Sequence, residues 1–125
     1  MIRFTIAYPP TRKGKAAWNK RFGLNAYYAG KHWAKRKKDA EELHAITRSA
    51  MIRAGIKKKA FKRPVNIKIL FDDRLDCSNH AVLVKCIEDA MKGWVIEDDD
   101  RRYVRSITTG FNENGCIEVY VNEVK

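Results

Sequence analysis

Residues 65–71 constrain the fold of this chain more than any other stretch, because an apolar side chain stands at every second position from Val65 to Phe71. A strict period of two predicts a β-strand with one buried face. Residues 83–94 then repeat apolar side chains at spacings of three and four, which predicts a helix with a core-facing stripe. Ser78 or Asn79 is expected to cap that helix.

Four further segments complete the expected strands and helices. Residues 2–8 alternate or run apolar until two prolines stop them, which predicts a first strand. Residues 26–54 are rich in Ala, Lys, Arg and Glu, contain a single glycine, and predict a long helix with Gly55 as its C-cap. Residues 103–111 and 116–121 predict two strands, and the Asn-Gly pair between them suits a hairpin.

Residues 11–25 contain two glycines and many basic or amide side chains, which indicates a mobile loop. Trp18 and Phe22 lie within this segment. They either stack on bases or sugars of a nucleic acid, or pack beneath the loop, and the sequence favours neither interpretation.

The order strand, helix, strand, helix, strand, strand predicts an α+β fold with two main helices packed on a mixed β-sheet. The central strand–helix–strand unit fits a parallel crossover, and the last two strands must be antiparallel. At 125 residues the chain is long enough to bury a core, and we expect one domain, residues 1–125.

Charge is segregated along the chain. Residues 1–63 carry a net charge of +15, whereas the remaining residues carry −4. A basic surface of this size indicates a nucleic-acid partner, because each neutralised phosphate releases counterions. The alternative is a solvated basic face that serves solubility alone. The candidate phosphate contacts are Lys31, Lys35, Arg36, Lys38, Lys57, Lys58, Lys59 and Arg74.

The cysteines and the hydropathy pattern indicate a compartment. Three cysteines without a CxxC pair argue against a disulfide framework or a zinc site, and favour a reducing cytoplasm. The three histidines show no metal-ligand spacing. There is no run of eighteen apolar residues and no cleavable signal pattern at the start, so we expect a cytoplasmic protein without a membrane partner.

Nine of the fifteen acidic residues lie between positions 72 and 100, most of them in a first acidic segment, residues 72–76, and a second acidic segment, residues 97–100. Packed carboxylates repel one another unless a cation lies among them. Mg²⁺ binds a few carboxylates, keeps several waters and contacts substrate phosphate directly. Whether the two segments meet depends on how residues 93–100 turn, because the ends of the predicted strands that carry them lie opposite each other.

Lys85 lies on the predicted helix between the two acidic segments, on the face away from its apolar stripe. Two or three carboxylates with one lysine suffice for phosphodiester hydrolysis, since the lysine neutralises charge on the phosphate in the transition state. The alternative is that Lys85 simply pairs with Asp89, four residues further along the helix.

Three stretches together resemble the signature of the RusA family of phage and prophage Holliday-junction resolvases. They are residues 75–79, residues 85–91 and residues 97–104, and they resemble a D-x-D-N element, a K-x-x-x-D-A-hydrophobic element and an Asp-Asp pair before a strand. Residues 8–10 (Tyr-Pro-Pro) and residues 24–28 resemble further family features. The resemblance extends over nearly the whole chain.

The resemblance implies roles for residues that match the family motifs. Matched in order, these are Asp76 and Asn79 of the first element, Lys85 and Asp89 of the second, and the late pair Asp98 and Asp99. Ser78 stands where a second aspartate is expected, and a hydroxyl does not replace a carboxylate's charge. Asp73 or Asp100 is the expected compensation. The family further implies a homodimer that binds four-way DNA junctions and uses Mg²⁺ or Mn²⁺ to nick two strands symmetrically.

We therefore expect a single RusA-like nuclease domain that resolves Holliday junctions in DNA recombination and repair, in a bacterial cytoplasm and of phage or prophage origin. Asp76 and Asp99 would be the main metal ligands, with Asp73 and Asp98 supporting them. Lys85 would be catalytic, and Ser78, Asn79 and Asp89 would support the site. Two alternatives stay open: a catalytically weakened protein that binds junction or duplex DNA, and a basic RNA- or DNA-binding module whose acids form surface ion pairs.

Overall fold

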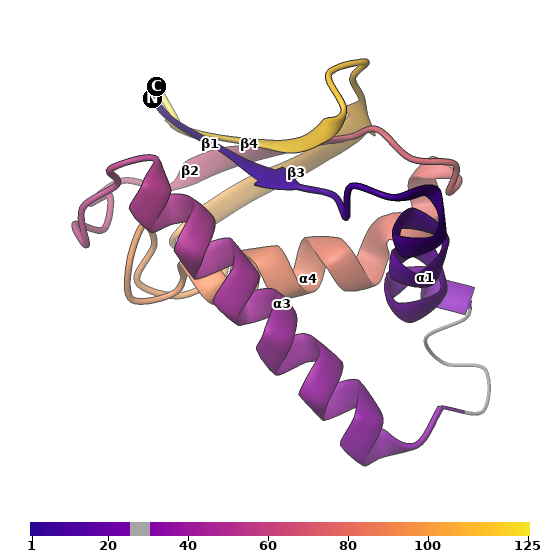
Figure 1. Ribbon diagram of the computed structural model, residues 1–125. Helices are drawn as coiled ribbons and strands as arrows, with labels where there is room; N and C mark the ends of the chain where they lie inside the picture. Colours follow the sequence, from indigo (N-terminus) through magenta and orange to yellow (C-terminus); the bar gives the residue numbers. More distant parts are fainter. Residues whose placement is uncertain (26–30) are drawn as a thin grey trace.

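The computed structural model describes residues 1–25 and 31–125, and it has an α+β fold with a mixed sheet, as expected (Figure 1). The described residues form three main helices instead of two. In chain order the elements are β1 (Ile2–Ala7), α1 (Arg12–Phe22), α3 (Trp33–Arg53), β2 (Val65–Phe71), the 3₁₀ helix η1 (Cys77–His80), α4 (Ala81–Met91), β3 (Val104–Phe111) and β4 (Cys116–Glu123).

The sheet has the strand order β1-β4-β2-β3. β2 and β3 are parallel, which confirms the predicted crossover through α4. β4 is antiparallel to both β1 and β2. The predicted hairpin between the last two strands is wrong, because β2 lies between them.

Residues 112–115 explain why the last two strands are not neighbours. Their chain crosses the end of β2, where the Asn112 N–H donates to the Phe71 carbonyl at 2.8 Å. The Gly115 N–H donates to Asp72 Oδ2, also at 2.8 Å, and Gly115 takes a φ of 72° that favours glycine. These bonds to the end of β2 carry the chain past that strand.

The core lies between the sheet and helices α3 and α4, which pack on one side of it (Figure 1). β2 alternates buried and more exposed side chains, as its sequence predicts. α4 buries Leu83, Ile87 and Met91 completely. Each such side chain contributes about 1.5–3 kcal/mol when it leaves water. α4 is therefore held firmly in place, with its polar face turned away from the core.

Residues 12–22 form helix α1, so the predicted mobile loop is wrong. Thr11 is the N-cap, and its Oγ1 accepts a hydrogen bond from the Gly14 N–H at 2.9 Å. Trp18 and Phe22 are buried and pack edge-on, with ring centroids 4.7 Å apart. These aromatic side chains hold α1 against the body of the protein and do not face a nucleic acid.

Helix α3 begins at Trp33, after His32, whose Nδ1 accepts from the Ala34 N–H. Residues 26–30 of the predicted long helix lie outside the described residues. The helix ends at Arg53 with Ala54 as its C-cap, one residue before the expected Gly55, which has a φ of 73°. Among the helices of the described residues, none combines the length and the apolar character needed to cross a membrane.

Candidate functional site

The chain reverses direction directly after α4. Gly93 has a φ of 73°, and its N–H donates to the Ile96 carbonyl at 2.7 Å. Trp94, Val95 and Ile96 are buried, and the indole N–H of Trp94 donates to the Ile56 carbonyl. This tight turn anchors the start of the second acidic segment and returns it alongside α4.

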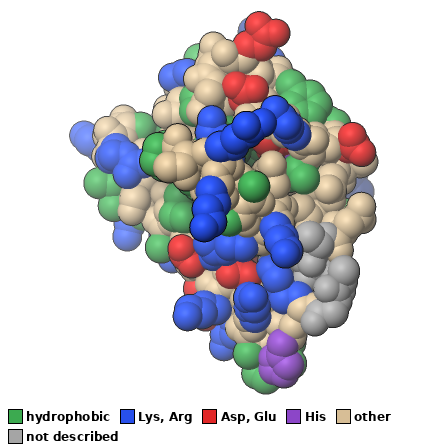
Figure 2. Space-filling model, turned by 45° about the vertical axis from the view of Figure 1, so that its right-hand side comes forward, with side chains coloured by type: hydrophobic (Ala, Val, Ile, Leu, Met, Phe, Trp, Pro, Cys, Tyr) green, Lys and Arg blue, Asp and Glu red, His purple; other side chains and the backbone are tan. Residues whose placement is uncertain are grey.

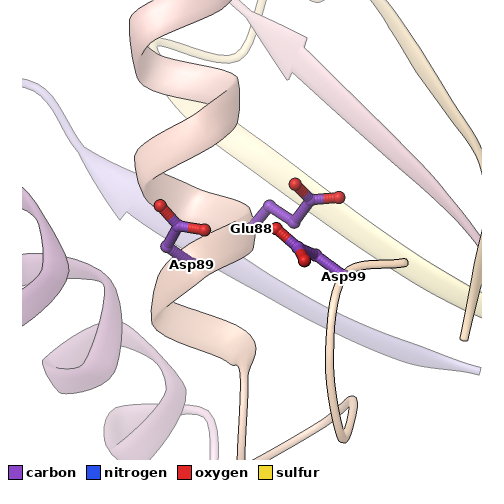
Figure 3. Close-up of side chains that lie close together, drawn as sticks. All are labelled: Glu88, Asp89 and Asp99. Carbon is purple, nitrogen blue, oxygen red and sulfur yellow. The ribbon is translucent and has the colours of Figure 1, made fainter.

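Three carboxylates meet where the second acidic segment passes α4. Glu88 and Asp89 come from the helix and Asp99 from the loop that follows it (Figure 3). One oxygen atom from each lies within 4.8 Å of the others. We call these three residues the carboxylate cluster. It is the only group of this kind that the described part of the chain forms.

Lys85 of α4 and Lys92, the C-cap residue that follows the helix, lie against the carboxylate cluster. Lys85 Nζ is 2.5 Å from Asp99 Oδ2 and 3.3 Å from Asp89 Oδ1. Lys92 Nζ is 3.0 Å from the same Asp99 oxygen and 3.1 Å from the same Asp89 oxygen. The pairing of Lys85 with Asp89 was one of the two interpretations of Lys85, and the contact with Asp99 is additional.

The ion pairs shift the pKa values in the cluster. Hydrogen bonds from Lys85 and then Lys92 hold the pKa of Asp99 well below its usual range. The hydrogen bond to Asp99 likewise raises the pKa of Lys85. Burial raises the pKa of Glu88, although the charge of Lys85 opposes this. Asp99 is therefore ionised at neutral pH, as a metal-binding carboxylate must be.

The donor set of the cluster fits a hard divalent cation. Carboxylate oxygens are the protein ligands that Mg²⁺ prefers. Asp89 Oδ1 is buried and has no well-aligned hydrogen bond, although both ammonium groups lie within ion-pair distance of it. The Lys85 side chain is 59% exposed, so it can leave the cluster without disturbing the core. The cluster could thus exchange an ammonium group for a metal ion.

A groove of about 320 Å³ adjoins the cluster and reaches the first residues of η1. Lys85 and Glu88 line it on the side of α4, Cys77 and Ser78 on the side of η1, and Thr109 on the side of β3. The structure therefore brings Ser78 and Lys85 to one groove, although they are seven positions apart in the sequence.

The first acidic segment does not join the carboxylate cluster. Asp76 is exposed at the start of η1, and its carbonyl accepts from the Asn79 N–H. Asp98 is 55% exposed and accepts a hydrogen bond from the Asp99 N–H. The structure groups Asp99 with Glu88 and Asp89, and not with Asp76 or Asp73. The first acidic segment follows the C-terminal end of β2, whereas the second precedes the N-terminal end of β3, and these two strands are parallel.

Asp73 has a different role from the predicted one. His80 Nε2 lies 2.8 Å from its carboxylate, and the Tyr8 hydroxyl donates to Oδ2 at 3.2 Å. His80 Nδ1 lies 2.9 Å from the Cys77 carbonyl. Both ring nitrogens lie at hydrogen-bond distance from acceptors, which favours the imidazolium form of the ring. Burial lowers the pKa of His80, but the hydrogen bond to Asp73 and those to backbone carbonyls raise it overall. We call Tyr8, Asp73 and His80 the buried ion-pair network.

The other predicted supporting residues have structural contacts. Asn79 Oδ1 accepts from the Asn25 N–H at 3.0 Å. Neither Ser78 nor Asn79 caps α4: that prediction is wrong, because η1 continues directly into the helix and His80 takes the N-cap position without a side-chain bond.

The predicted basic residues separate into two kinds. Lys31 Nζ bonds Asp39 at 2.8 Å and the Arg21 carbonyl at 2.9 Å, so it serves an internal ion pair. Arg36 donates to the Lys31 carbonyl, and Lys58 Nζ lies 4.8 Å from the Trp94 ring centroid. Exposed residues make up the second kind: Lys35, Lys38, Lys57, Lys59 and Arg74. Figure 2 turns the side of α1 forward and shows Lys and Arg side chains spread across the middle of that face.

Sequence reasoning did not single out Glu88 or His44. Glu88 is buried one turn beyond Lys85, and the spacing of three along a helix was the available signal. His44 on α3 lines a hollow of about 260 Å³ with Lys85 and Asp89, and its Nε2 is buried without a hydrogen-bond partner. Burial lowers the pKa of His44, so the ring is neutral at neutral pH.

Comparison of the chain with protein-family models and with curated proteins gives no match. The chemistry of the site is therefore inferred from its side chains and from the motif spacing alone.

Proposed function

We propose that this protein is a divalent-metal-dependent, structure-selective DNA endonuclease of the RusA type, which cleaves phosphodiester bonds of four-way junctions. One observation carries the proposal: the Lys85 ammonium group contacts the carboxylate cluster and also lines the groove that leads to Ser78. A cation beside ionised carboxylates, in a groove open to a phosphate, is the arrangement that phosphodiester hydrolysis requires.

Each group of the site has a role under this proposal. Glu88, Asp89 and Asp99 would hold Mg²⁺ or Mn²⁺, which when bound supplies an acidified water and offsets phosphate charge. Lys85 neutralises a phosphate in the groove, and the Ser78 hydroxyl donates a hydrogen bond to a phosphate oxygen there. Asp76, exposed at the start of η1, stays a predicted ligand.

Glu88 is the residue that compensates for Ser78. A serine in the first motif leaves the site one carboxylate short of the family pattern. Asp73 is committed to His80, and Asp100 accepts two hydrogen bonds from the Arg102 guanidinium. Glu88 instead belongs to the carboxylate cluster. The charge that Ser78 lacks therefore comes from α4.

The polyanionic substrate follows from charge. The chain carries a net charge of +11, and its exposed lysines include Lys35, Lys38, Lys57 and Lys59. Such a surface attracts phosphate backbones strongly at low salt. A second copy of the chain would supply a second site, and this pairing is how a homodimer would nick two strands of a junction symmetrically.

One observation favours a protein that binds junctions without cutting them. Lys85 and Lys92 already place two ammonium groups against three carboxylates, which reduces the need for a metal. Ser78, which stands where the family pattern has a carboxylate, also favours a protein that does not cut. This second candidate shares the DNA-binding surface and differs only in the cluster's affinity for a divalent cation.

The test uses a labelled four-way junction and a linear duplex of the same sequence, each incubated with the protein in Mg²⁺ or in EDTA. We expect Mg²⁺-dependent cleavage of the junction alone. Glu88→Gln should lower the cleavage rate about 100-fold or more, comparable to the loss when one group that stabilises charge in a transition state is removed. Asp100→Asn is the matched control, because it also removes an acidic charge next to Asp99 but lies outside the cluster, and it should cleave normally.

The outcomes separate the candidates. Tight junction binding in EDTA with no cleavage in Mg²⁺ or Mn²⁺ supports the non-cleaving protein. Equal binding of junction and duplex supports a general nucleic-acid-binding module. Equal loss of cleavage in Glu88→Gln and Asp100→Asn would show that the cluster has no special part in the reaction.

A further inference from the structure

A cavity of about 490 Å³ lies between α1 and the first acidic segment. Three residues of α1, at spacings of three and four, form one wall: Arg12, Lys15 and Asn19. Asp72, Asp73 and Arg74 form the opposite wall. The cavity was invisible in the sequence, because its first wall exists only once residues 12–22 form a helix.

The cations of this cavity have no partners, whereas its carboxylates do. Within residues 1–25 and 31–125, no ion pair or hydrogen bond involves the side chain of Arg12, Lys15 or Arg74. Asp73 is held by His80, and Asp72 Oδ2 accepts the Gly115 N–H. Among the described residues, the cavity thus presents three unpaired cations and an amide against one carboxylate, Asp72, that has no cationic partner.

The start of α1 adds to the positive potential of the cavity. Its first turn contains no acidic residue, although that is where helices usually carry them. Arg12, Lys13 and Lys15 occupy it instead. A cation beside the positive end of a helix dipole is unfavourable, and an anion in the cavity would remove this conflict.

The wall that α1 forms is fixed in position before any ligand arrives. A Cβ on Gly14 would lie 2.8 Å from the Pro9 Cβ, so the helix passes directly against the Pro9–Pro10 turn. Trp18 and Phe22 anchor the helix below. A preformed helix spares a ligand the entropy of ordering the backbone of this wall.

The buried ion-pair network separates this cavity from the groove at Lys85. Asp73 lines the cavity and His80 lines the groove, and the two side chains are 2.8 Å apart. A strand bound beside Lys85 can therefore run on toward Arg12 and Lys15 and place another of its phosphates there. We infer that the cavity between α1 and the first acidic segment binds a backbone phosphate of the DNA strand whose cleavage is proposed above, and fixes the register of that strand. The assignment of DNA as the polyanion rests on the proposed function.

The test measures binding of a fluorescent four-way junction by anisotropy, in EDTA and over a series of NaCl concentrations. The double variant Arg12→Gln/Lys15→Gln removes the α1 wall's charge. The control Lys13→Gln/Lys20→Gln removes the same charge from the same helix, at exposed positions outside the cavity. Arg74→Gln tests the opposite wall independently.

We expect Arg12→Gln/Lys15→Gln to weaken binding about tenfold or more and to reduce the salt slope by about one to two, since each lost phosphate contact lowers it by about one. The control should weaken binding less than about threefold, and Arg74→Gln should weaken it more than the control does. Equal weakening by the variant pair and the control would overturn the inference.

Because binding is measured without metal, the two proposals fail separately. A wild-type protein that never cleaves but depends on Arg12 and Lys15 for binding refutes the nuclease and retains the cavity. If the wild type cleaves the junction, but Arg12→Gln/Lys15→Gln and the control bind it equally well, the phosphate site in the cavity is refuted and the nuclease is retained. A wild-type protein that binds no junction refutes both.

Discussion

The buried ion-pair network and the carboxylate cluster both use aspartates from the acid-rich part of the chain, yet their environments differ. The Asp73 side chain is 4% exposed, and its cation is the imidazolium of His80, which stacks on Phe71 with ring centroids 3.9 Å apart. The Asp99 side chain is 21% exposed, and its cations are the flexible side chains of Lys85 and Lys92. One pair is fixed by packing and the other is adjustable.

This difference decides what each aspartate can do. Removing one partner of a buried ion pair leaves an uncompensated charge in the interior, so the pair cannot release its cation. An exposed pair contributes little to stability and separates easily. A carboxylate is therefore a candidate metal ligand when its present cation can leave. The density of acidic residues in the sequence does not make this distinction.

The largest expected effect is on stability. Asp73→Asn removes the counter-ion of the buried His80 ring, which then either stays charged without a partner or loses its proton and a hydrogen bond, and we expect a loss of up to about 3–5 kcal/mol in the free energy of unfolding. Asp99→Asn should leave the free energy of unfolding nearly unchanged, because solvent and the remaining carboxylates accommodate both lysines. Urea unfolding followed by circular dichroism measures both variants. Equal destabilisation by the two substitutions would erase the distinction between the two regions.

Local patterns predicted most of the fold. The alternation in residues 65–71 marked β2 with the bounds that the structure has, and the stripe from Leu83 to Met91 marked α4. α1 was missed because the two glycines and the many basic or amide side chains of residues 11–25 were taken to indicate a loop. The order of the strands was missed because an Asn-Gly turn reports local backbone shape, and it does not report that Asn112 bonds across the end of β2.

The candidate site was predictable only in part. Lys85, Asp89 and Asp99 were identified from motif spacing, and the structure brings them together. Asp76 was expected beside Asp99 because both match motifs of the family that the chain resembles, and Asp73 was expected there as compensation for Ser78. Which end of a strand each segment occupies depends on tertiary contacts such as the turn at Gly93, and no short pattern encodes those contacts.

The second expected effect is stabilisation by metal. Mn²⁺ or Mg²⁺ at about 100 times its dissociation constant should stabilise the wild type by about 2.7 kcal/mol, since only the folded chain assembles the cluster. Glu88→Gln should lose this gain, whereas Asp100→Asn should keep it. Thermal unfolding with and without the ion measures the gain. An unfolding temperature of the wild type that changes with neither ion would contradict the metal site.

Lys85→Met tests whether the cation of the carboxylate cluster can be replaced by a metal ion. The substitution removes the ammonium group that competes for Asp99 and Asp89, so the metal should bind several times more tightly. Cleavage should nevertheless fall, because the phosphate in the groove loses its neutralising charge. Isothermal titration with Mn²⁺ and the junction cleavage assay give the two results. Weaker metal binding in Lys85→Met would mean that the lysine organises the carboxylates instead of competing for them.

The smallest expected effect is a pH dependence of the free energy of unfolding, which arises from His80 in the buried ion-pair network. The pKa of His80 in the folded protein is raised above its ordinary value of 6.5. The stabilisation that the His80–Asp73 ion pair contributes is therefore complete below pH 6.5, and it is lost as the pH rises through the folded-state pKa of His80. The loss amounts to about 1.4 kcal/mol for each pKa unit of difference between the folded and unfolded states. In NMR titrations the His80 ring signal should shift above pH 6.5 and that of His44 below it, because burial lowers the pKa of His44. A His80 signal that titrates below pH 6.5 would show that Asp73 does not hold an imidazolium, and the two acidic regions would then differ in exposure alone.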